Sequence, residues 1–447
     1  MTIRSYIAIA VANVSRAGLL LLGRNATTLP GLLAEKIAPN LYPYLLEQIP
    51  KGVVFITGTN GKTTTTAMAR HLLAEQFTII SNVGGSNLIR GHLTALVANY
   101  SIIQGFKDNT LALLETDELF VAEAINLGAR PTAIAVLNLF RDQLDRFGEI
   151  DSITRKWEKA LAKSPGTRLL INSNDPRLAA LGKKYSERTE YFGLDAPALL
   201  LPKPSSMADT GDLSVEYSGY YVSHMGNYKG EPEKTTALTS ANWGEEHWKI
   251  TLQVDTETIQ ASLQTPGRYN LFNAVAALAI AKELMVDTYS VANRLESFTP
   301  AFSRFEKVYI DGKPIWLVLV KNPVALSETL ATIQEMVGGS TYNIILGSND
   351  NIADGKDVSW YFDADISSLS GNPPANCMCF GTRARDMRLR LSYGLEQEVS
   401  LINLDEVAKA IGGLSGETFI LTTYTATLEL RETLTSQGHI KKWSTHA

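Results

Sequence analysis

Two glycines, a lysine and a run of threonines near residue 60 resemble a phosphate-binding loop, although Ile56 stands where the usual pattern has its first glycine. Residues 58–64 read Gly-Thr-Asn-Gly-Lys-Thr-Thr. Glycines let backbone N–H groups converge on an anion, a lysine can reach the β- and γ-phosphates, and the next hydroxyl can ligate Mg²⁺. The segment therefore predicts a site for ATP and Mg²⁺. The nucleotide-binding residues that we expect are Gly58, Thr59, Asn60, Gly61, Lys62, Thr63 and Thr64, with Thr63 also on the metal.

A cluster of acids supplies candidate metal ligands. Residues 110–118 read as a central strand that ends in Glu115, Asp117 and Glu118. A carboxylate at the tip of a strand beside a phosphate loop can hold the Mg²⁺ that bridges nucleotide phosphates. Glu115 is the predicted ligand, and Asp117 and Glu118 are the alternates. The competing interpretation is a solvated acidic strand end.

The segments around these residues predict an α/β protein with a parallel sheet. Residues 53–56 are apolar and mostly β-branched or aromatic, which predicts a buried strand, and the pattern becomes helical after the glycines. Further strands are predicted at 77–80, 132–137 and 169–174, with an edge hairpin at 248–263. The loop 81–87 follows a strand's carboxyl end, where open α/β sheets bind ligands, so we expect it on the substrate side.

The chain is long enough for about three domains. Of its 447 residues, 45% are apolar and 19% charged, and the net charge of −5 argues against nucleic acid as a partner. We expect an N-terminal helical segment (1–45), a central ATP-binding domain (46–300) with a β insertion (205–234), and a C-terminal domain (301–447). Alternating strands and helices in the last part predict a Rossmann-like fold.

The first helix and the two cysteines bear on location. Residues 6–22 are largely apolar, but Asn13, Ser15 and Arg16 interrupt them, which argues against a transmembrane span or a signal peptide. An amphipathic helix packed on the protein is favoured over an interfacial membrane helix. Cys377 and Cys379 are too close together to bridge readily, and we expect reduced thiols in a cytoplasmic protein.

The form Gly-Thr-Asn-Gly-Lys-Thr resembles the Mur ligase family and the folylpolyglutamate synthetases. The resemblance implies a Mur ligase-like P-loop domain, and it extends to the segment after residue 137, where Gln143 stands in place of a histidine that helps to ligate a second Mg²⁺. It also implies a carbamoylated lysine near Trp157, for which Lys156 and Lys159 are candidates. Relatives carry a four-cysteine zinc ribbon near residues 205–234, but this segment has no cysteine, so no zinc is expected.

The same resemblance assigns residues around the nucleotide. The segment 265–277 is similar to a Mur pattern in which asparagine amides face adenine, which implies this role for Asn270 and Asn273; helix N-capping is the alternative. Residues 303–306 resemble the family's Gly-Arg-x-Glu, so Arg304 is expected to cross the cleft and meet the γ-phosphate.

Two departures favour one branch of that family. Amino-acid-adding Mur ligases carry an acid and then Ala-x-Asn-Pro after the strand predicted at 315–320, whereas this chain has Lys321 beside Asn322. Fewer groups then remain to hold an amino acid, and ammonia becomes the expected nucleophile. Residues 349–360 resemble the signature of the MurT family, whose members work with a glutaminase, GatD. An aspartate of this loop is thought to orient the partner's histidine, which implies Asp357, with Asp354 as the alternate.

The resemblance implies a complete reaction. ATP would phosphorylate the α-carboxyl of D-glutamate in lipid II at the inner face of the membrane, and ammonia from GatD would displace the phosphate to give D-isoglutamine. Lys62 and Arg304 would neutralise charge on the transferring group. Two alternatives remain, namely an amino-acid-adding ligase of the Mur or folylpolyglutamate type and a non-enzymatic, nucleotide-gated scaffold.

Overall fold

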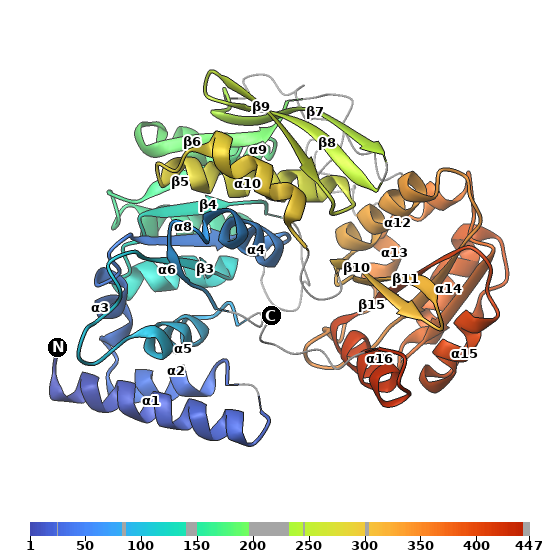
Figure 1. The fold of residues 1–447 in the computed structure, drawn as a ribbon, viewed down its shortest axis with the longest axis horizontal. Helices are drawn as coiled ribbons and strands as arrows, with labels where there is room; N and C mark the ends of the chain where they lie inside the picture. Colours follow the sequence, from blue (N-terminus) through green and yellow to red (C-terminus); the bar gives the residue numbers. More distant parts are fainter. Residues whose placement is uncertain are drawn as a thin grey trace.

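The computed structural model describes residues 1–24, 26–82, 86–139, 150–195, 232–244, 246–299 and 304–440. The sequence-based fold class is confirmed, since the chain is an α/β protein with two largely parallel sheets. Figure 1 shows the larger sheet with the N-terminal helices below it and the C-terminal sheet beside it. Residues 205–231 of the predicted β insertion lie outside the described part.

The larger sheet has the strand order β2-β3-β1-β4-β5-β6-β7-β8-β9. Strands β2 to β7 run parallel, and β8 and β9 form the predicted antiparallel hairpin at the edge. The strands are β1 (Val53–Thr57), β2 (Thr78–Ile80), β3 (Thr110–Glu115), β4 (Ala133–Val136), β5 (Arg168–Asn172), β6 (Thr189–Leu194), β7 (Thr236–Gly244), β8 (His247–Val254) and β9 (Glu257–Leu263).

Helices cover both faces of this sheet because its central strands are apolar on both sides. Alternate residues of β1 enter different cores: Val54 and Ile56 join one, and Val53 and Phe55 join the other. The first core is closed by α4 (Lys62–Leu73), α10 (Arg268–Glu283) and α11 (Thr288–Ala292). The second is closed by α1 (Ile3–Leu21), α2 (Leu29–Ile37), α3 (Leu41–Glu47), α5 (Ile89–Asn99), α6 (Glu118–Asn126), α8 (Ile150–Leu161) and α9 (Pro176–Lys183).

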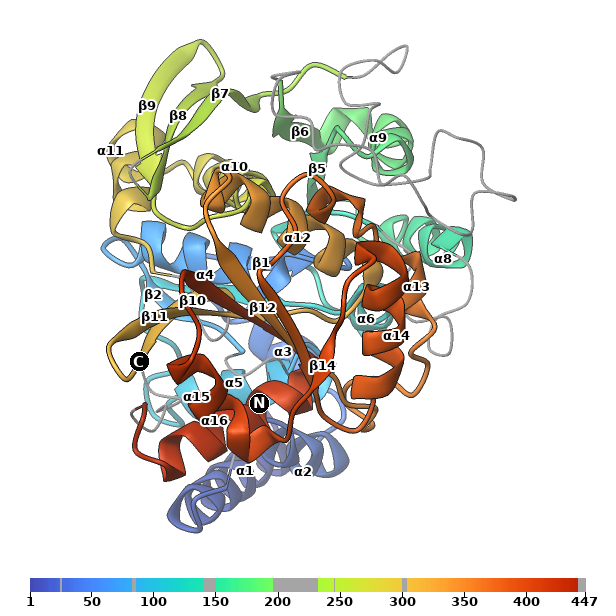
Figure 2. The same cartoon turned by 90° about the vertical axis from the view of Figure 1, so that its right-hand side faces the viewer.

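The C-terminal sheet has the strand order β10-β11-β15-β12-β13-β14, and all neighbours except β10 and β11 are parallel. Figure 2 views the molecule from the side of this sheet. Its strands are β10 (Arg304–Ile310), β11 (Lys313–Leu319), β12 (Tyr342–Gly347), β13 (Asn376–Phe380), β14 (Ser400–Leu401) and β15 (Glu417–Thr422). Its helices are α12 (Pro323–Val337), α13 (Trp360–Asp363), α14 (Ala384–Leu395), α15 (Val407–Gly412) and α16 (Tyr424–Ser436).

The two cysteines, which were expected to be reduced, form no disulfide in the structure. Cys377 and Cys379 are free and buried on β13. Burial raises the pKa of the Cys377 thiol to about 12, because the charged thiolate would lose its hydration. Neither thiol is placed to act as a nucleophile.

Candidate functional site

The phosphate-binding loop joins β1 to α4 at the middle of the larger sheet. Gly58 and Gly61 have φ angles of 140° and 86°, which residues with a Cβ rarely adopt. A Cβ on Gly61 would also lie 2.4 Å from Asn273 Oδ1. The loop therefore needs both glycines, and it leaves the N–H groups at the start of α4 available to an anion.

Asn138, which follows β4, braces this loop from the neighbouring strand. Its Oδ1 accepts from the N–H of Asn60 at 2.8 Å, and its Nδ2 donates to the carbonyl of Asn60 at 2.8 Å. Its backbone carbonyl also accepts from the N–H of Thr59 at 3.1 Å. The loop is thus pre-shaped by protein contacts alone. This role of Asn138 was not predicted from the sequence.

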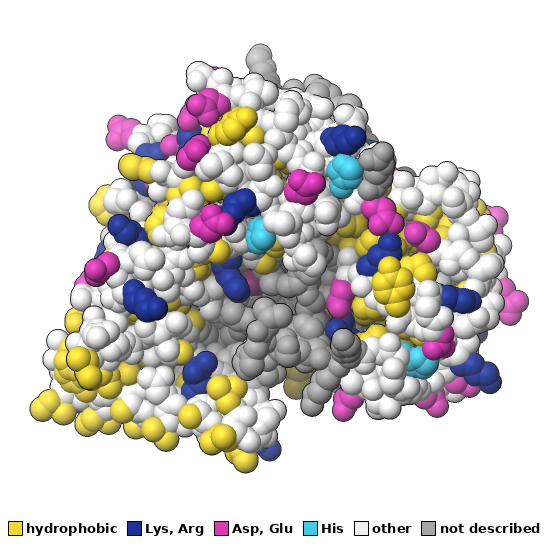
Figure 3. Space-filling view, viewed as in Figure 1, with side chains coloured by type: hydrophobic (Ala, Val, Ile, Leu, Met, Phe, Trp, Pro, Cys, Tyr) yellow, Lys and Arg dark blue, Asp and Glu magenta, His cyan; other side chains and the backbone are white. Residues whose placement is uncertain are grey.

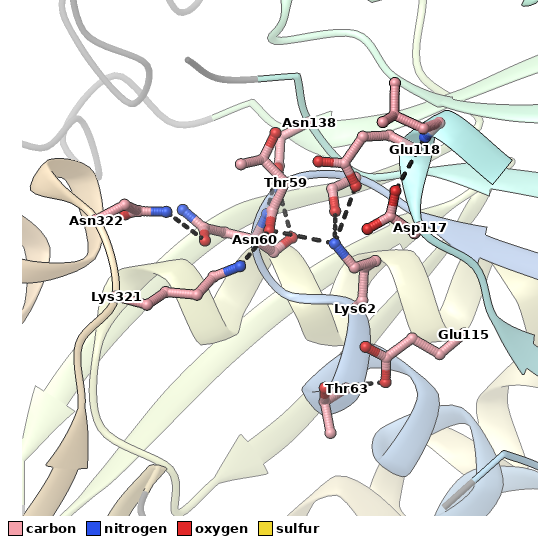
Figure 4. Close-up of polar contacts among 12 residues, drawn as sticks. Thr59, Asn60, Lys62, Thr63, Glu115, Asp117, Glu118, Asn138, Lys321 and Asn322 are labelled. Atoms are coloured by element: carbon pink, nitrogen blue, oxygen red, sulfur yellow. Dashed lines mark hydrogen bonds and ion pairs between the residues drawn. The ribbon is translucent and has the colours of Figure 1, made fainter. Parts of the chain in front are cut away.

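Lys62 is buried and faces several acids. Its Nζ lies 3.1 Å from Glu118 Oε2 and also donates to the carbonyls of Gly58 and Thr59. Burial by itself would lower the pKa of Lys62. The nearby carboxylates, of which Glu118 has the largest effect, more than compensate, so the pKa is raised above its ordinary value. The lysine therefore stays charged, and Figure 4 shows it turned toward the loop and Glu118.

Thr63 and Glu115 form the candidate Mg²⁺ site. Thr63 Oγ1 donates to Glu115 Oε2 at 2.9 Å, so a hydroxyl and a carboxylate oxygen meet at the start of α4 (Figure 4). Hard oxygen donors of this kind suit Mg²⁺, which retains several waters and phosphate oxygens as ligands. No group of three or more His, Cys, Asp or Glu gathers as a metal site in the described part of the chain. The two side chains fit a metal shared with a nucleotide.

The backbone of Glu115 is fixed by two side chains from other elements. Asn82 accepts from its N–H at 2.9 Å and donates to its carbonyl at 2.8 Å. His92 Nε2 lies 2.8 Å from the same carbonyl, while Tyr42 lies 3.0 Å from His92 Nδ1. Burial lowers the pKa of His92 to about 4, so the ring is neutral and Nε2 carries the proton. This chain of hydrogen bonds, from Tyr42 through His92 to the carbonyl of Glu115, was not predicted from the sequence.

Asn270 and Asn273 lie behind the loop on α10. Asn273 Oδ1 accepts from Thr65 Oγ1 at 3.1 Å, and its Nδ2 donates to Asn270 Oδ1 at 3.0 Å. The N-capping alternative is wrong, because Gly267 occupies the N-cap of α10 and neither amide caps the helix. Their assignment to adenine stays a prediction.

The C-terminal domain reaches the phosphate loop through two adjacent residues. Lys321 Nζ donates to the carbonyl of Thr59 at 3.2 Å, and Asn322 Nδ2 donates to Asn60 Oδ1 at 3.1 Å. Both residues follow β11, and Figure 4 shows them approaching the loop from the side opposite Glu118. A second cation, on the residue directly before Asn322, therefore stands at the loop.

Several predicted residues lie apart from this centre or outside the described part. Gln143 is among the undescribed residues, as is the side chain of Arg304, which begins β10. Lys156 and Lys159 are exposed on α8, whereas Trp157 between them is buried and donates to the carbonyl of Glu118 at 2.7 Å. The indole thus takes the inward position in this part of α8.

The two aspartates predicted to meet a partner differ sharply in their surroundings. Asp354 is buried and accepts from Asn351 N–H and from the backbone and hydroxyl of Thr425, which fixes the loop after β12 to the start of α16. Asp357 is partly exposed, and its Oδ1 accepts from Ser359 N–H at 2.8 Å. Asp357 is the one that presents carboxylate surface to solvent.

Comparisons with known proteins cover almost the whole chain. Residues 56–281 match the Mur ligase middle domain, and residues 319–427 match the MurT ligase C-terminal domain. The chain is 30% identical to the lipid II isoglutaminyl synthase (glutamine-hydrolysing) subunit MurT of Staphylococcus aureus (strain COL), over 96% of this chain and 98% of that protein. It is also 30% identical to the subunit of the same name from Streptococcus pneumoniae (strain ATCC BAA-255 / R6), over 99% of both chains.

Solved structures of low sequence identity share the fold. MurF of Acinetobacter baumannii superposes with a TM-score of 0.66 at 16% identity, covering 91% of this chain and 80% of that one. MurF of Thermotoga maritima in complex with ADP gives a TM-score of 0.63 at 15% identity, covering 90% and 84%. These likenesses confirm the Mur ligase fold that the loop sequence implied.

Proposed function

Because the chain belongs to the MurT family of Mur ligases, and is therefore an ATP-dependent ligase, we propose that it amidates the α-carboxyl of D-glutamate in lipid II. The product would be D-isoglutamine within the stem peptide. The observation that carries the proposal is the family's phosphate loop with Lys62 and the Thr63–Glu115 pair in place. Cytoplasmic ATP and a lipid-linked substrate together put the reaction at the inner face of the membrane.

The reaction has two balanced steps. A carboxylate oxygen attacks the γ-phosphorus of ATP, the bond from that phosphorus to the bridging oxygen breaks, and ADP leaves. Ammonia then attacks the acyl carbon, the bond to the phosphate oxygen breaks, and the nitrogen loses a proton. A free carboxylate is a poor electrophile, so the acyl phosphate supplies the leaving group that amide formation requires.

The residues of the loop have distinct tasks in this scheme. Lys62 neutralises charge on the β- and γ-phosphates, and Arg304 would add a second cation at the γ-phosphate. Thr63 and Glu115 would hold Mg²⁺, which supplies positive charge to the transferring phosphoryl group. Lys321 places a further cation beside Thr59. The chain also lacks the acid that amino-acid-adding ligases carry before their Ala-x-Asn-Pro segment, which favours ammonia over an amino acid.

Ammonia is assigned to a separate glutaminase of the GatD type. Neither of the chain's two cysteines is exposed or activated, which supports the assignment of the nucleophile that hydrolyses glutamine to another polypeptide. We assign the contact with that partner to the loop after β12, and favour Asp357 over Asp354 as the residue that orients the partner's histidine. Asp354 already accepts several hydrogen bonds within its own loop and from Thr425.

The test is an in vitro reaction with ATP, Mg²⁺ and lipid II, supplied either with ammonium or with glutamine and the glutaminase. Mass spectrometry should show a product one mass unit lighter than the substrate, with ADP released in equal amount. Lys62→Met should abolish both. A product lengthened by an amino acid would instead identify an amino-acid-adding ligase, and turnover retained in Lys62→Met would favour the scaffold alternative.

A further inference from the structure

The outward face of α1 is apolar along its whole length. Its inward face packs through Ala8, Ile9 and Ala12, as the sequence predicted for a helix lying on the protein. The side chains that point outward are nevertheless apolar as well. Those exposed to solvent at helical spacing include Ile3 (79%), Ile7 (50%), Val14 (72%) and Leu21 (89%).

This face lies at an outer margin of the molecule. Figures 1 and 2 both place α1 at the end farthest from the hairpin of β8 and β9, and Figure 3 shows apolar side chains along that margin. The loop after α5 lies beside the start of α1, since Tyr100 Oη donates to Met1 Sδ at 3.5 Å. This loop adds Ile102 and Ile103, the latter 93% exposed. A cluster of exposed apolar side chains of this kind marks an interaction surface.

The charges on this part of the chain indicate which kind of partner the exposed face of α1 would bind. Residues 1–34 contain Arg4, Arg16 and Arg24 but no aspartate or glutamate. Arg4 and Arg24 are exposed, and Arg16 is half-buried. An apolar helix face flanked by arginines, with no acid, complements the anionic surface of a bilayer.

A second copy of the chain would fit this face poorly. In a twofold interface the same helix would meet itself, so that arginines would face arginines with no acid on either helix. No helix in the described part of the chain is long and apolar enough to cross a membrane. Because one face of α1 packs on the protein and the other is apolar and exposed, the helix suits a position parallel to the surface of a bilayer.

We propose that α1 docks the protein on anionic lipid bilayers, lying in the interface with Ile3, Ile7, Val14 and Leu21 inserted. Asn13 Nδ2 donates to the carbonyl of Val97 at 3.2 Å, which ties α1 to α5 and so to the domain that carries the nucleotide site. Docking would hold that domain beside a lipid-linked substrate. The purpose rests on the proposed function, but the docking itself does not.

The test is sedimentation of the full chain with vesicles that contain neither lipid II nor nucleotide. Vesicles of equal parts phosphatidylglycerol and phosphatidylcholine should carry the protein down, whereas phosphatidylcholine alone should bind it far less. The double variant Val14→Asp/Leu21→Asp should lower the ratio of bound to free protein at least ~10-fold, because both side chains would have to leave the apolar layer. Both residues are exposed, so its thermal midpoint should be unchanged.

The matched control is Leu389→Asp/Tyr393→Asp, which adds the same charge at exposed apolar positions of α14 and should bind like the wild type. Equal binding to both kinds of vesicle, or equal binding of the α1 variant and the wild type, would overturn the proposal. A lipid-free dimer that Val14→Asp/Leu21→Asp dissociates would assign the face to a second copy. Since vesicle binding involves no catalysis, its failure leaves the amidation proposal standing.

Discussion

The ion pair between Lys62 and Glu118 gives the sharpest test of how the phosphate loop is stabilised. The two side chains are 8% and 5% exposed, and their charged atoms lie 3.1 Å apart. Removing one partner of a buried ion pair costs about 3–5 kcal/mol, because the other charge is left without compensation. In Glu118→Gln the Lys62 ammonium keeps its hydrogen bonds to the carbonyls of Gly58 and Thr59, so we expect the free energy of unfolding to fall by about 3 kcal/mol.

The same change should strengthen nucleotide binding. In the wild type, Glu118 competes with phosphate oxygens for Lys62 and adds negative charge beside them. Glu118→Gln removes both effects, so ADP without Mg²⁺ should bind ~10-fold more tightly, which is about 1.4 kcal/mol. The stability lost in the free protein is then partly recovered on binding, and ADP should raise the unfolding midpoint of the variant more than that of the wild type.

Chemical denaturation and calorimetric titration of ADP in EDTA measure the two quantities. Glu35→Gln is the matched control, because Glu35 pairs with Arg90 at 2.7 Å but the two are 35% and 50% exposed, so its loss should cost less than about 1 kcal/mol. Unchanged stability of Glu118→Gln, or weaker ADP binding in EDTA, would refute the reasoning that Glu118 is the resting partner of Lys62.

Three further predictions address other contacts. Thr63→Ala should lower ATP turnover by ~100-fold in Mg²⁺ while leaving ADP affinity in EDTA within about twofold, since the hydroxyl serves the metal; equal loss in both would contradict this. Lys321→Met should lower kcat ~10-fold with an unchanged unfolding midpoint, because it removes a charge at Thr59 but no buried packing; a kcat equal to that of the wild type would refute it. Burial raises the pKa of Glu328 to about 8, so the folded protein holds a proton that the unfolded chain has released above about pH 4.5. Stability should therefore fall as pH rises from about 5 to 8, and Glu328→Gln should flatten that slope in thermal melts; a variant as pH-dependent as the wild type would argue against it.

The central part of the site could be predicted because its signals are local. Strand, glycine turn and helix follow one another within residues 53–73, and the structure confirms that order. The meeting of Thr63 with Glu115 was also foreseeable, since β1 and β3 are parallel neighbours and their carboxyl ends share one edge.

Contacts made across long sequence separations could not be predicted. Lys321 and Thr59 are 262 residues apart, and no period or spacing links them. His92 is one of several polar residues in a largely apolar helix, so its sequence position does not mark it out. Only the folded chain brings its ring to the carbonyl of Glu115. Glu118 was proposed as a metal ligand of second rank, because the sequence does not show that the first turn of α6 faces Lys62.

The order of strands in the C-terminal sheet has a consequence for the proposed transfer of ammonia. Lys321 and Asn322 follow β11, the aspartate loop follows β12, and β15 alone separates these two parallel strands. Adjacent strands are about 4.8 Å apart. The two loops therefore begin at the same edge of the sheet, and their first residues lie roughly 10 Å from each other. A glutaminase anchored on the second loop would release its volatile, easily protonated product within a short diffusion path of the activated acid, and little of it would escape to bulk water.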